Sequence, residues 1–207
     1  MTLTAPELHS RREQNKLATR QAIIQAALLL LRNHGLGQFT ADQLAEEAGI
    51  SRRTFFNYFP SPEAALAATT EGFLDVAIAS FYDRPADESL LDSAIAAVSA
   101  LADPGHLGPM AEVCSLTIGQ AQMSRFQLEA WDNATARLTE ATLQRLGPDT
   151  DQLYVRAMVG AVIACGKAAM EIWLERHGGK DNTPESLAEL RQLLVESISL
   201  LRDGFAH

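Results

Sequence analysis

The chain has 207 residues, of which 47% are hydrophobic and 21% charged, a balance typical of globular proteins. Its formal net charge of -9 is unevenly divided: residues 1–60 hold seven Lys or Arg against five Asp or Glu, and residues 61–207 hold ten against twenty-one. An acidic body repels phosphate, so only the N-terminal part is expected to approach a nucleic acid.

The residue patterns of catalytic and metal sites are missing from the sequence. It has no glycine-rich phosphate loop, no G-x-S-x-G and no metal-ligand cluster, and its five histidines are scattered. We therefore predict that the protein is not an enzyme and needs no catalytic residue, metal or cofactor. Cys114 and Cys165 lie far apart without a cationic neighbour in sequence, and we interpret both as small buried hydrophobic residues.

No targeting or membrane segment is predicted. The first residues are polar and lack the apolar core of a secretory signal. Uninterrupted apolar runs such as residues 157–166 are shorter than the roughly 20 residues that cross a bilayer. A cytoplasmic protein with no membrane partner is expected.

In chain order, residues 1–10 are predicted to be a flexible arm and residues 11–33 a long helix ended by glycines. An apolar stripe on this helix should cover the inward face of the two short helices that follow. It comprises Leu17, Ile24, Leu28 and Leu31. Arg11, Arg12 and Lys16 could bind phosphate or could be a solvated helix end.

Two short helices with a tight turn are predicted between Thr40 and Phe59. Thr40 and Gln43 have the spacing of a capping box, in which each side chain bonds the backbone of the other residue. Gly49 stands where a helix C-terminus favours positive φ, and Ser51 is a fresh N-cap. The turn is therefore about as short as a helix-turn-helix requires.

The second of these helices carries residue types that read bases. Arginine can pair with guanine, asparagine can pair with adenine, and threonine offers a hydroxyl and a methyl group. Arg52, Arg53, Thr54 and Asn57 occupy the N-terminal and outer surface, while Phe55 and Phe59, four residues apart, should pack inward. The alternative interpretation is that Arg52 and Arg53 are solvated surface charges.

The stretch from Thr40 to Phe59 resembles the DNA-binding domain of the TetR family of transcriptional regulators. The matching positions are Ala45, Ala48, Gly49, Ile50, Ser51, Thr54, Phe55, Tyr58 and Phe59. The resemblance implies base contacts from Arg52, Arg53, Thr54 and Asn57, and phosphate contacts from Thr40, Ser51 and Tyr58. Phe56 completes this DNA-binding set, although the family usually has a tyrosine hydroxyl there. Ser61-Pro62-Glu63 replaces a lysine that the family tends to carry at the start of helix four.

The remainder is predicted to be entirely helical, because no strand pattern, repeat or low-complexity tract occurs. Helices are expected over residues 62–82, 88–101, 110–117, 123–146, 149–177 and 184–203. A Gly108-Pro109 interruption should precede the short third helix of this series. Asp149 and Gln152 are read as a capping box, and Thr183 as a cap followed by proline.

The last two predicted helices, about 149–177 and 184–203, each have an apolar face. Met158, Ala161, Val162, Cys165, Ala169 and Ile172 form the first face, and Leu190, Leu193, Leu194, Ser197 and Leu201 the second. These faces could be internal core or could bind a second copy of the chain. The resemblance implies the latter, since regulators of this family form dimers through these helices. Such a dimer would read a palindromic operator in double-stranded DNA.

A ligand pocket is predicted between the DNA-reading helices and the last two helices. Its candidate residues are Phe73, Phe81, Leu116, Met123, Phe126, Trp131, Met170 and Trp173. Large apolar side chains on converging helices suit a small-molecule site, although each could equally serve as core. Residues 85–200 also resemble regulators whose second domain binds acyl-CoA-like ligands.

The predicted fold is all-α, with an N-terminal three-helix helix-turn-helix domain over residues 1–60 and a larger helical ligand-binding and dimerisation domain over 61–207. The predicted function is a repressor released from its operator by a largely apolar effector that changes the tilt of the helix over residues 62–82. The alternative is a helical ligand-binding or scaffold protein without specific DNA binding.

Overall fold

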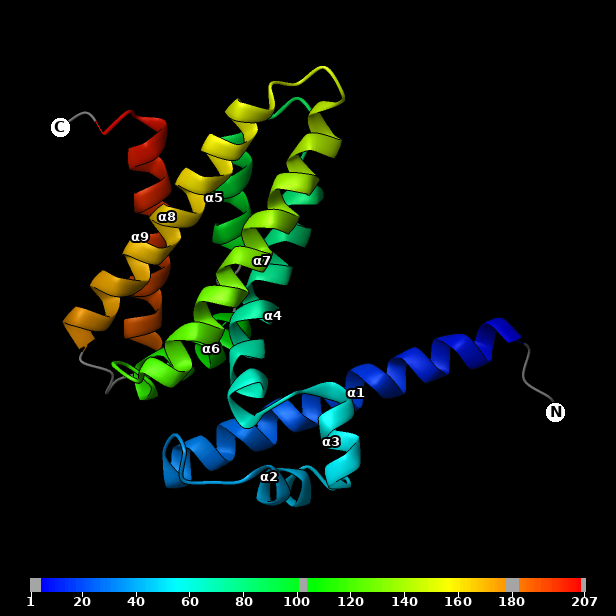
Figure 1. Ribbon diagram of the computed structural model, residues 1–207. Coiled ribbons are helices and arrows are strands. Elements are labelled where there is room, and N and C mark those ends of the chain that lie inside the picture. The colour runs from blue at the N-terminus through cyan, green and yellow to red at the C-terminus, as the bar shows by residue number, and fades with distance from the viewer. Residues whose placement is uncertain (1–4, 101–103, 178–182, 206–207) are drawn as a thin grey trace. The chain divides into compact units, whose positions relative to one another are not determined.

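The computed structural model describes residues 5–100, 104–177 and 183–205, and within them the chain is helical, with no strand (Figure 1). The chain divides into two compact units, Met1–Ala68 and Thr69–His207. The all-α prediction is confirmed. The division falls inside α4 (Pro62–Tyr82), since the first two turns of this helix belong to the N-terminal unit.

The N-terminal unit contains α1 (Ala5–His34), α2 (Ala41–Glu47), α3 (Arg52–Tyr58) and the start of α4. Its core is a small set of fully covered apolar side chains from these helices. They include Ile23, Leu28, Leu31, Leu44, Phe55 and Leu66. Burial of this kind contributes roughly 1.5–3 kcal/mol for each large side chain, which is what holds two very short helices in place.

The structure corrects the predicted start of the first helix. Residues 5–10 are helical rather than a loose arm, and residues 1–4 lie outside the described residues. Pro6 is compatible with this start because the first helical turn has no use for its missing amide hydrogen. Leu17 is 68% exposed and so lies outside the core, whereas Ile24, Leu28 and Leu31 are buried as predicted.

The second unit holds the rest of α4, followed by five further helices in the described residues. They are α5 (Leu90–Ala100), α6 (Pro104–Leu116), α7 (Ala121–Leu146), α8 (Gln152–His177) and α9 (Pro184–Arg202). In this unit α8 packs against α7 and α9, and α9 packs against α5.

In the second unit, two predicted helix starts differ clearly from the structure. The helix α6 begins at Pro104 and continues through Pro109, because Leu107, Met110 and Ala111 are buried in the core and keep this segment in place. The N-cap of α8 is Asp151 rather than Asp149. Its Oδ1 accepts a hydrogen bond from the Leu153 amide at 2.8 Å, a cap that Asp149 lies too far back to provide.

The core of the second unit is centred on Trp173 of α8, which has no exposed surface. Its indole Nε1 donates a hydrogen bond of 2.7 Å to the carbonyl of Ser186 at the start of α9. Met110 of α6 and Leu190 of α9 are equally covered and belong to the same apolar cluster. Trp173 therefore ties α8 to the first turn of α9 by packing and by one buried polar contact.

The helix faces that could form the core or a dimer contact are partly internal. Cys165 and Ala169 of α8, and Leu190 and Leu194 of α9, are buried within this unit. The exposed side of α8 overlaps the predicted face at Ile172, and its other apolar positions carry small residues. It comprises Ala157, Gly160, Ala164, Ala168 and Ile172.

The helices α4 and α8 are both long and apolar enough to cross a membrane by length and composition alone. Core helices of soluble proteins meet the same criterion. Within the most apolar 18-residue stretch of each helix, 56% of α4 is buried in the chain, but only 33% of α8. A smaller share of α8 than of α4 is thus buried within the chain.

An ion-pair network fixes the connection between α4 and α5. Arg84 Nη2 lies 2.5 Å from Glu88 Oε1, and Ser93 Oγ donates to Glu88 Oε2 at 2.7 Å. Arg145 of α7 donates to the backbone carbonyls of Pro85 and Glu88. The Arg84 guanidinium and the Ser93 hydroxyl lower the pKa of Glu88 from an ordinary 4.5 to about 2.

This network predicts a pH dependence of stability. Because the folded-state pKa of Glu88 lies below its unfolded value, its contribution is complete above pH 4.5 and is lost as the pH falls towards 2. Glu88→Gln should therefore flatten the loss of stability across this window in urea titrations. Glu140→Gln, which changes an exposed carboxylate on α7, is the control and should leave the wild-type pH profile unchanged. A Glu88→Gln profile as steep as the wild type would contradict the assignment.

Candidate nucleic-acid interface and effector pocket

The turn between α2 and α3 is held by the side chains predicted to cap it. Gln43 N donates to Thr40 Oγ1 at 3.3 Å, and Thr40 N donates to Gln43 Oε1 at 2.9 Å, which completes the capping box. Gly49 adopts φ +67°, a region that costs a residue with a Cβ about 1 kcal/mol or more. The predicted helix-turn-helix geometry is confirmed in these details.

Ser51 caps α3 and also holds a neighbouring hydroxyl. Its Oγ accepts the Thr54 amide at 3.0 Å and lies 2.8 Å from Thr54 Oγ1. Thr40 and Ser51 are exposed and Thr54 is half-buried. In this structure their hydroxyls are engaged in hydrogen bonds that stabilise the turn. The observed role of the Ser51 and Thr54 hydroxyls is to fix the first turn of α3.

The aromatic residues of α3 sort by face as predicted. Phe55 is fully buried and packs on Phe59 with the ring centroids 6.4 Å apart. Arg20 of α1 lies 5.3 Å over the Phe59 ring, which ties the end of α3 to α1. Phe56 is 45% exposed and Tyr58 is half-buried, so the outer surface of α3 is partly aromatic.

The two arginines of α3 differ in their surroundings. Arg52 Nη1 pairs with Asp42 Oδ2 at 2.7 Å and its guanidinium lies 5.4 Å over the Phe56 ring. Arg53 and Asn57 are exposed, and no side chain in the described residues engages either of them. Arg53 and Asn57 therefore lie on this face without a side-chain partner among the described residues. Arg52 beside them is held by its ion pair with Asp42.

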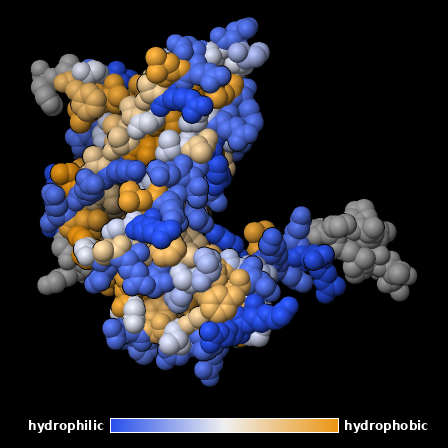
Figure 2. Space-filling view, viewed as in Figure 1, coloured by the Kyte–Doolittle hydropathy of each residue, from blue (hydrophilic) through white to orange (hydrophobic). Residues whose placement is uncertain are grey.

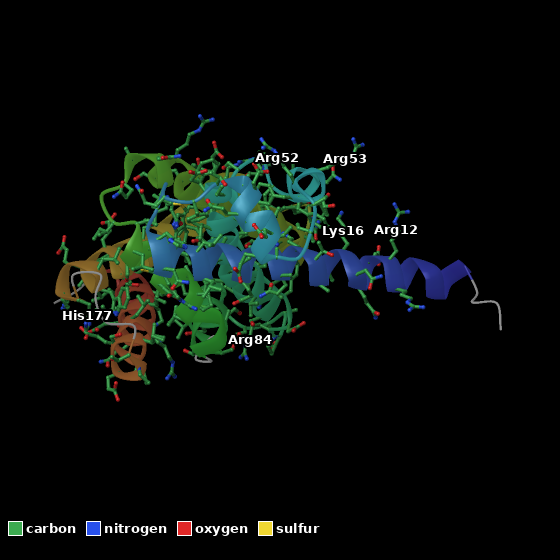
Figure 3. The ribbon with its side chains drawn as sticks, turned by 90° about the horizontal axis from the view of Figure 1, so that it is seen from below. Arg12, Lys16, Arg52, Arg53, Arg84 and His177 are labelled. Atoms are coloured by element: carbon green, nitrogen blue, oxygen red, sulfur yellow. The ribbon has the colours of Figure 1, made fainter. Side chains whose placement is uncertain are left out.

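Further positive charge lies on α1. Arg11, Arg12 and Lys16 are exposed, and Arg12 and Lys16, one turn apart, point to the same side of the helix (Figure 3). The labelled Arg52 and Arg53 lie towards that side as well. This unit thus carries several exposed cations on one side, which suits a polyanion.

The predicted ligand residues separate into different places in the second unit. Phe73, Phe81 and Trp131 line an apolar cavity of about 70 Å³. Met123, Met170 and, again, Trp131 line a second hollow of about 340 Å³. We call the first the apolar cavity and the second the polar groove, because the groove is also lined by Gln127, Lys167 and Glu171.

Three predicted pocket residues line neither hollow. Trp173 is in the core, Leu116 is 43% exposed, and Phe126 is half-buried away from both. Their large apolar side chains indicated packing contacts with other residues. They did not indicate which of the two hollows, if either, these residues would line. Gln127 and Lys167 were missed because a polar residue in a helix reads as solvated surface until its neighbouring helices are known.

Cys165 is buried as predicted, whereas Cys114 is half-buried. Both are free, and burial raises the pKa of the Cys114 thiol to about 12 and raises that of Cys165 as well. A protonated thiol is a poor nucleophile and a poor metal ligand. No group of three or more His, Cys, Asp or Glu in the described part of the chain could hold a metal ion.

Two family profiles match the chain. Residues 23–69 match the family described as bacterial regulatory proteins, tetR family, and residues 110–206 match the MftR C-terminal domain. The first match covers the helix-turn-helix and its supporting helices. The second covers most of the unit that holds the cavity and the groove.

Curated relatives are similar over the N-terminal part. The HTH-type transcriptional regulator EthR of Mycobacterium tuberculosis is 41% identical over 69 residues, which is 32% of each chain. The HTH-type transcriptional regulator RutR of Escherichia coli is 34% identical over 79 residues, 38% of this chain and 37% of the relative. The matches thus span about a third of each relative. Both are regulators, in agreement with the prediction that this chain is not an enzyme.

Solved structures share the whole fold at low identity. Thermus thermophilus FadR, a TetR family repressor in complex with lauroyl-CoA, has a TM-score of 0.54 at 21% identity over 91% of this chain and 95% of its own. Bacillus subtilis FadR in complex with stearoyl-CoA has a TM-score of 0.54 at 18% identity over 90% and 99%. At these identities the likeness establishes the fold.

Proposed function

Because the chain belongs to the TetR family of transcriptional regulators, we propose that it is a repressor that binds a palindromic operator as a dimer and is released by a small, largely apolar effector. The observation that supports operator binding best is the outer surface of α3. Arg53 and Asn57 are exposed and unengaged there, on a helix whose start is fixed by Ser51. These are the side chains that read guanine and adenine in a major groove.

Within this proposal the predicted DNA-binding residues take different roles. Arg53 and Asn57 read base edges. Arg52, held by Asp42, stands at the rim and contacts base or phosphate. Thr40, Ser51, Thr54 and Tyr58 border the same surface and, with Phe56, complete its contact area. Arg12 and Lys16 add phosphate contacts from α1, which raises affinity without regard to sequence.

A test of this assignment is Arg53→Ala. It should weaken operator binding by roughly 1–3 kcal/mol and relax the preference at one position in each half-site. The operator is first obtained by selection from a random duplex pool, and affinities are then measured by fluorescence anisotropy. Arg125→Ala, which removes an exposed arginine from α7, is the matched control and should bind as the wild type does. An equal loss on every sequence would make Arg53 a phosphate contact instead.

The dimer is proposed to form through α8 and α9. Two observations support this. Only 33% of the most apolar 18-residue stretch of α8 is buried, and the exposed side of α8 carries small residues that allow a second helix to come close. In the space-filling view, apolar and small residues are interspersed with hydrophilic ones along the region where α8 runs (Figure 2). On α9, Ala188 is exposed and Val195 half-buried, which would extend the same contact. Two-fold pairing presents two α3 helices to two half-sites.

The effector is proposed to occupy the second unit. The apolar cavity suits an apolar chain, and the solved relatives that carry lauroyl-CoA and stearoyl-CoA support an acyl-CoA-like compound as the effector class. Since α4 continues from the N-terminal unit into the unit that holds the cavity, a ligand that favours one tilt of α4 would alter operator binding. A protein with this function works where the chromosome is, in the cytoplasm.

The alternative, a helical ligand-binding or scaffold protein without specific DNA binding, gives different results in the same assay. It would select no sequence from the random pool, and any residual binding would fall with salt equally for all duplexes. The exposed Arg53 and Asn57 favour the regulator.

A further inference from the structure

Gln127 of α7 connects the polar groove to α4. The Thr70 hydroxyl of α4 donates a hydrogen bond of 2.8 Å to Gln127 Oε1, and Thr70 has no exposed surface. Gln127 lines the groove, and its Nε2 is buried with no acceptor among the described residues. A buried amide donor without a partner costs about 1–3 kcal/mol, so it is a place where a ligand oxygen would bind favourably.

Lys167 of α8 supplies a cation to the same groove. Its Nζ lies 5.8 Å from the centre of the Trp131 ring, and no carboxylate pairs with it in the described residues. Glu171 also lines the groove, but it is exposed, so solvent weakens its repulsion of an anion. The donors Gln127 and Lys167 together suit a carboxylate or another anionic or carbonyl oxygen.

Trp131 separates the groove from the apolar cavity, because it lines both. Its six-membered ring lies close to Gly166 of α8, where an added Cβ would be 3.8 Å from the ring. The cavity alone, at about 70 Å³, holds only a few carbon atoms. Cavity and groove together fall in the range of roughly 300–1,000 Å³ that is typical of ligand pockets.

On the basis of the regulator function proposed above, we propose that the polar groove binds the oxygen-bearing head of the effector through Gln127 and Lys167. Ligand binding at Gln127 then affects α4 through the hydrogen bond between Gln127 and Thr70. The effector is then an amphipathic molecule whose apolar chain passes Trp131 towards the cavity. Binding at Nε2 fixes the Gln127 amide and strengthens its bond to Thr70, because hydrogen bonds in series polarise one another. The arrangement of α4 that keeps this bond is favoured when the ligand is present.

The head group is tested with three probes that share one chain: octanoate, octan-1-ol and octylamine. Titration calorimetry of the full chain should give the tightest binding for octanoate. Gln127→Met and Lys167→Met should each weaken octanoate binding roughly tenfold, since each removes a bond to a charged group. Gln144→Met is the matched control, because Gln144 also lies on α7 and bonds α4, through the Tyr82 hydroxyl, but does not line the groove. Equal binding of the three probes, or unchanged affinity in Gln127→Met, would overturn the assignment of the groove.

The link to α4 is tested with Thr70→Val, which removes the hydroxyl and keeps the shape. Octanoate should still bind, because both donors remain. In the wild type octanoate should slow hydrogen exchange in α4 and weaken operator binding by about five- to 150-fold, the usual size of allosteric coupling. In Thr70→Val both effects should be lost.

Undiminished coupling in Thr70→Val would overturn the relay while leaving the regulator intact. If the wild type selects no DNA sequence, the proposed function fails, but calorimetry and hydrogen exchange still decide the role of the groove and of Thr70.

Discussion

Ala164→Glu is expected to convert the proposed dimer into a monomer and to reduce operator affinity by two orders of magnitude or more, on the order of 3 kcal/mol. Ala164 lies in the middle of the exposed side of α8, one turn from Gly160 and Ala168. A carboxylate there would meet its own copy across a two-fold axis in an apolar setting, where like charges repel and desolvation is costly. A monomer reads only one half-site and loses the gain from binding two linked sites.

Sedimentation velocity measures the oligomeric state and anisotropy measures the operator affinity of the same samples. Ala79→Glu, on the exposed side of α4, is the matched control and should remain a dimer that binds DNA. A dimeric Ala164→Glu with normal operator affinity would place the interface elsewhere.

Trp173→Ala is expected to destabilise the second unit by about 3–5 kcal/mol. The side chain is fully buried, and its removal leaves a large cavity between α6, α8 and α9 and removes the hydrogen bond to the Ser186 carbonyl. With a total stability of roughly 5–15 kcal/mol for a typical protein, this change brings the unit close to unfolding. Urea unfolding followed by circular dichroism gives the free energy directly.

Two further variants separate packing from hydrogen bonding at this position. Trp173→Phe keeps most of the apolar volume and loses the indole N–H, so it should cost less than the alanine change. Trp131→Ala removes a half-buried tryptophan that lines open space and should cost less as well. A Trp131→Ala protein less stable than Trp173→Ala would contradict the assignment of Trp173 to the centre of the core.

Features encoded within a few residues were predictable from the sequence. The capping box of Thr40 and Gln43, the cap at Ser51, the positive φ of Gly49 and the cap at Thr183 all occur as predicted. Each depends on contacts between residues at most three positions apart, and the sequence contains both partners. The inward packing of Phe55 likewise follows from helical spacing within one short element.

Features that depend on neighbouring helices were not predictable from the sequence. Pro109 reads as a helix breaker, yet α6 continues through it because packing of its neighbours outweighs a lost backbone bond. The sequence left open whether the apolar face of α8 is core or interface, because only the position of α9 shows which of its residues are covered. The groove donors Gln127 and Lys167 face helices remote in sequence, so nothing in their local pattern marks them.

The most direct test of sequence-specific DNA binding through α3 is fluorescence anisotropy of the purified protein with labelled DNA from upstream of its own gene. A scrambled duplex serves as the control, and both duplexes are measured at two salt concentrations. If α3 reads an operator, the protein should bind the upstream duplex tightly and the scrambled one weakly. Binding should weaken as salt rises, because phosphate contacts release counterions. If the upstream duplex does not bind, a sequence selected from a random pool takes its place. Equal, weak binding to every duplex, with no sequence enriched from the pool, would contradict a reading role for α3.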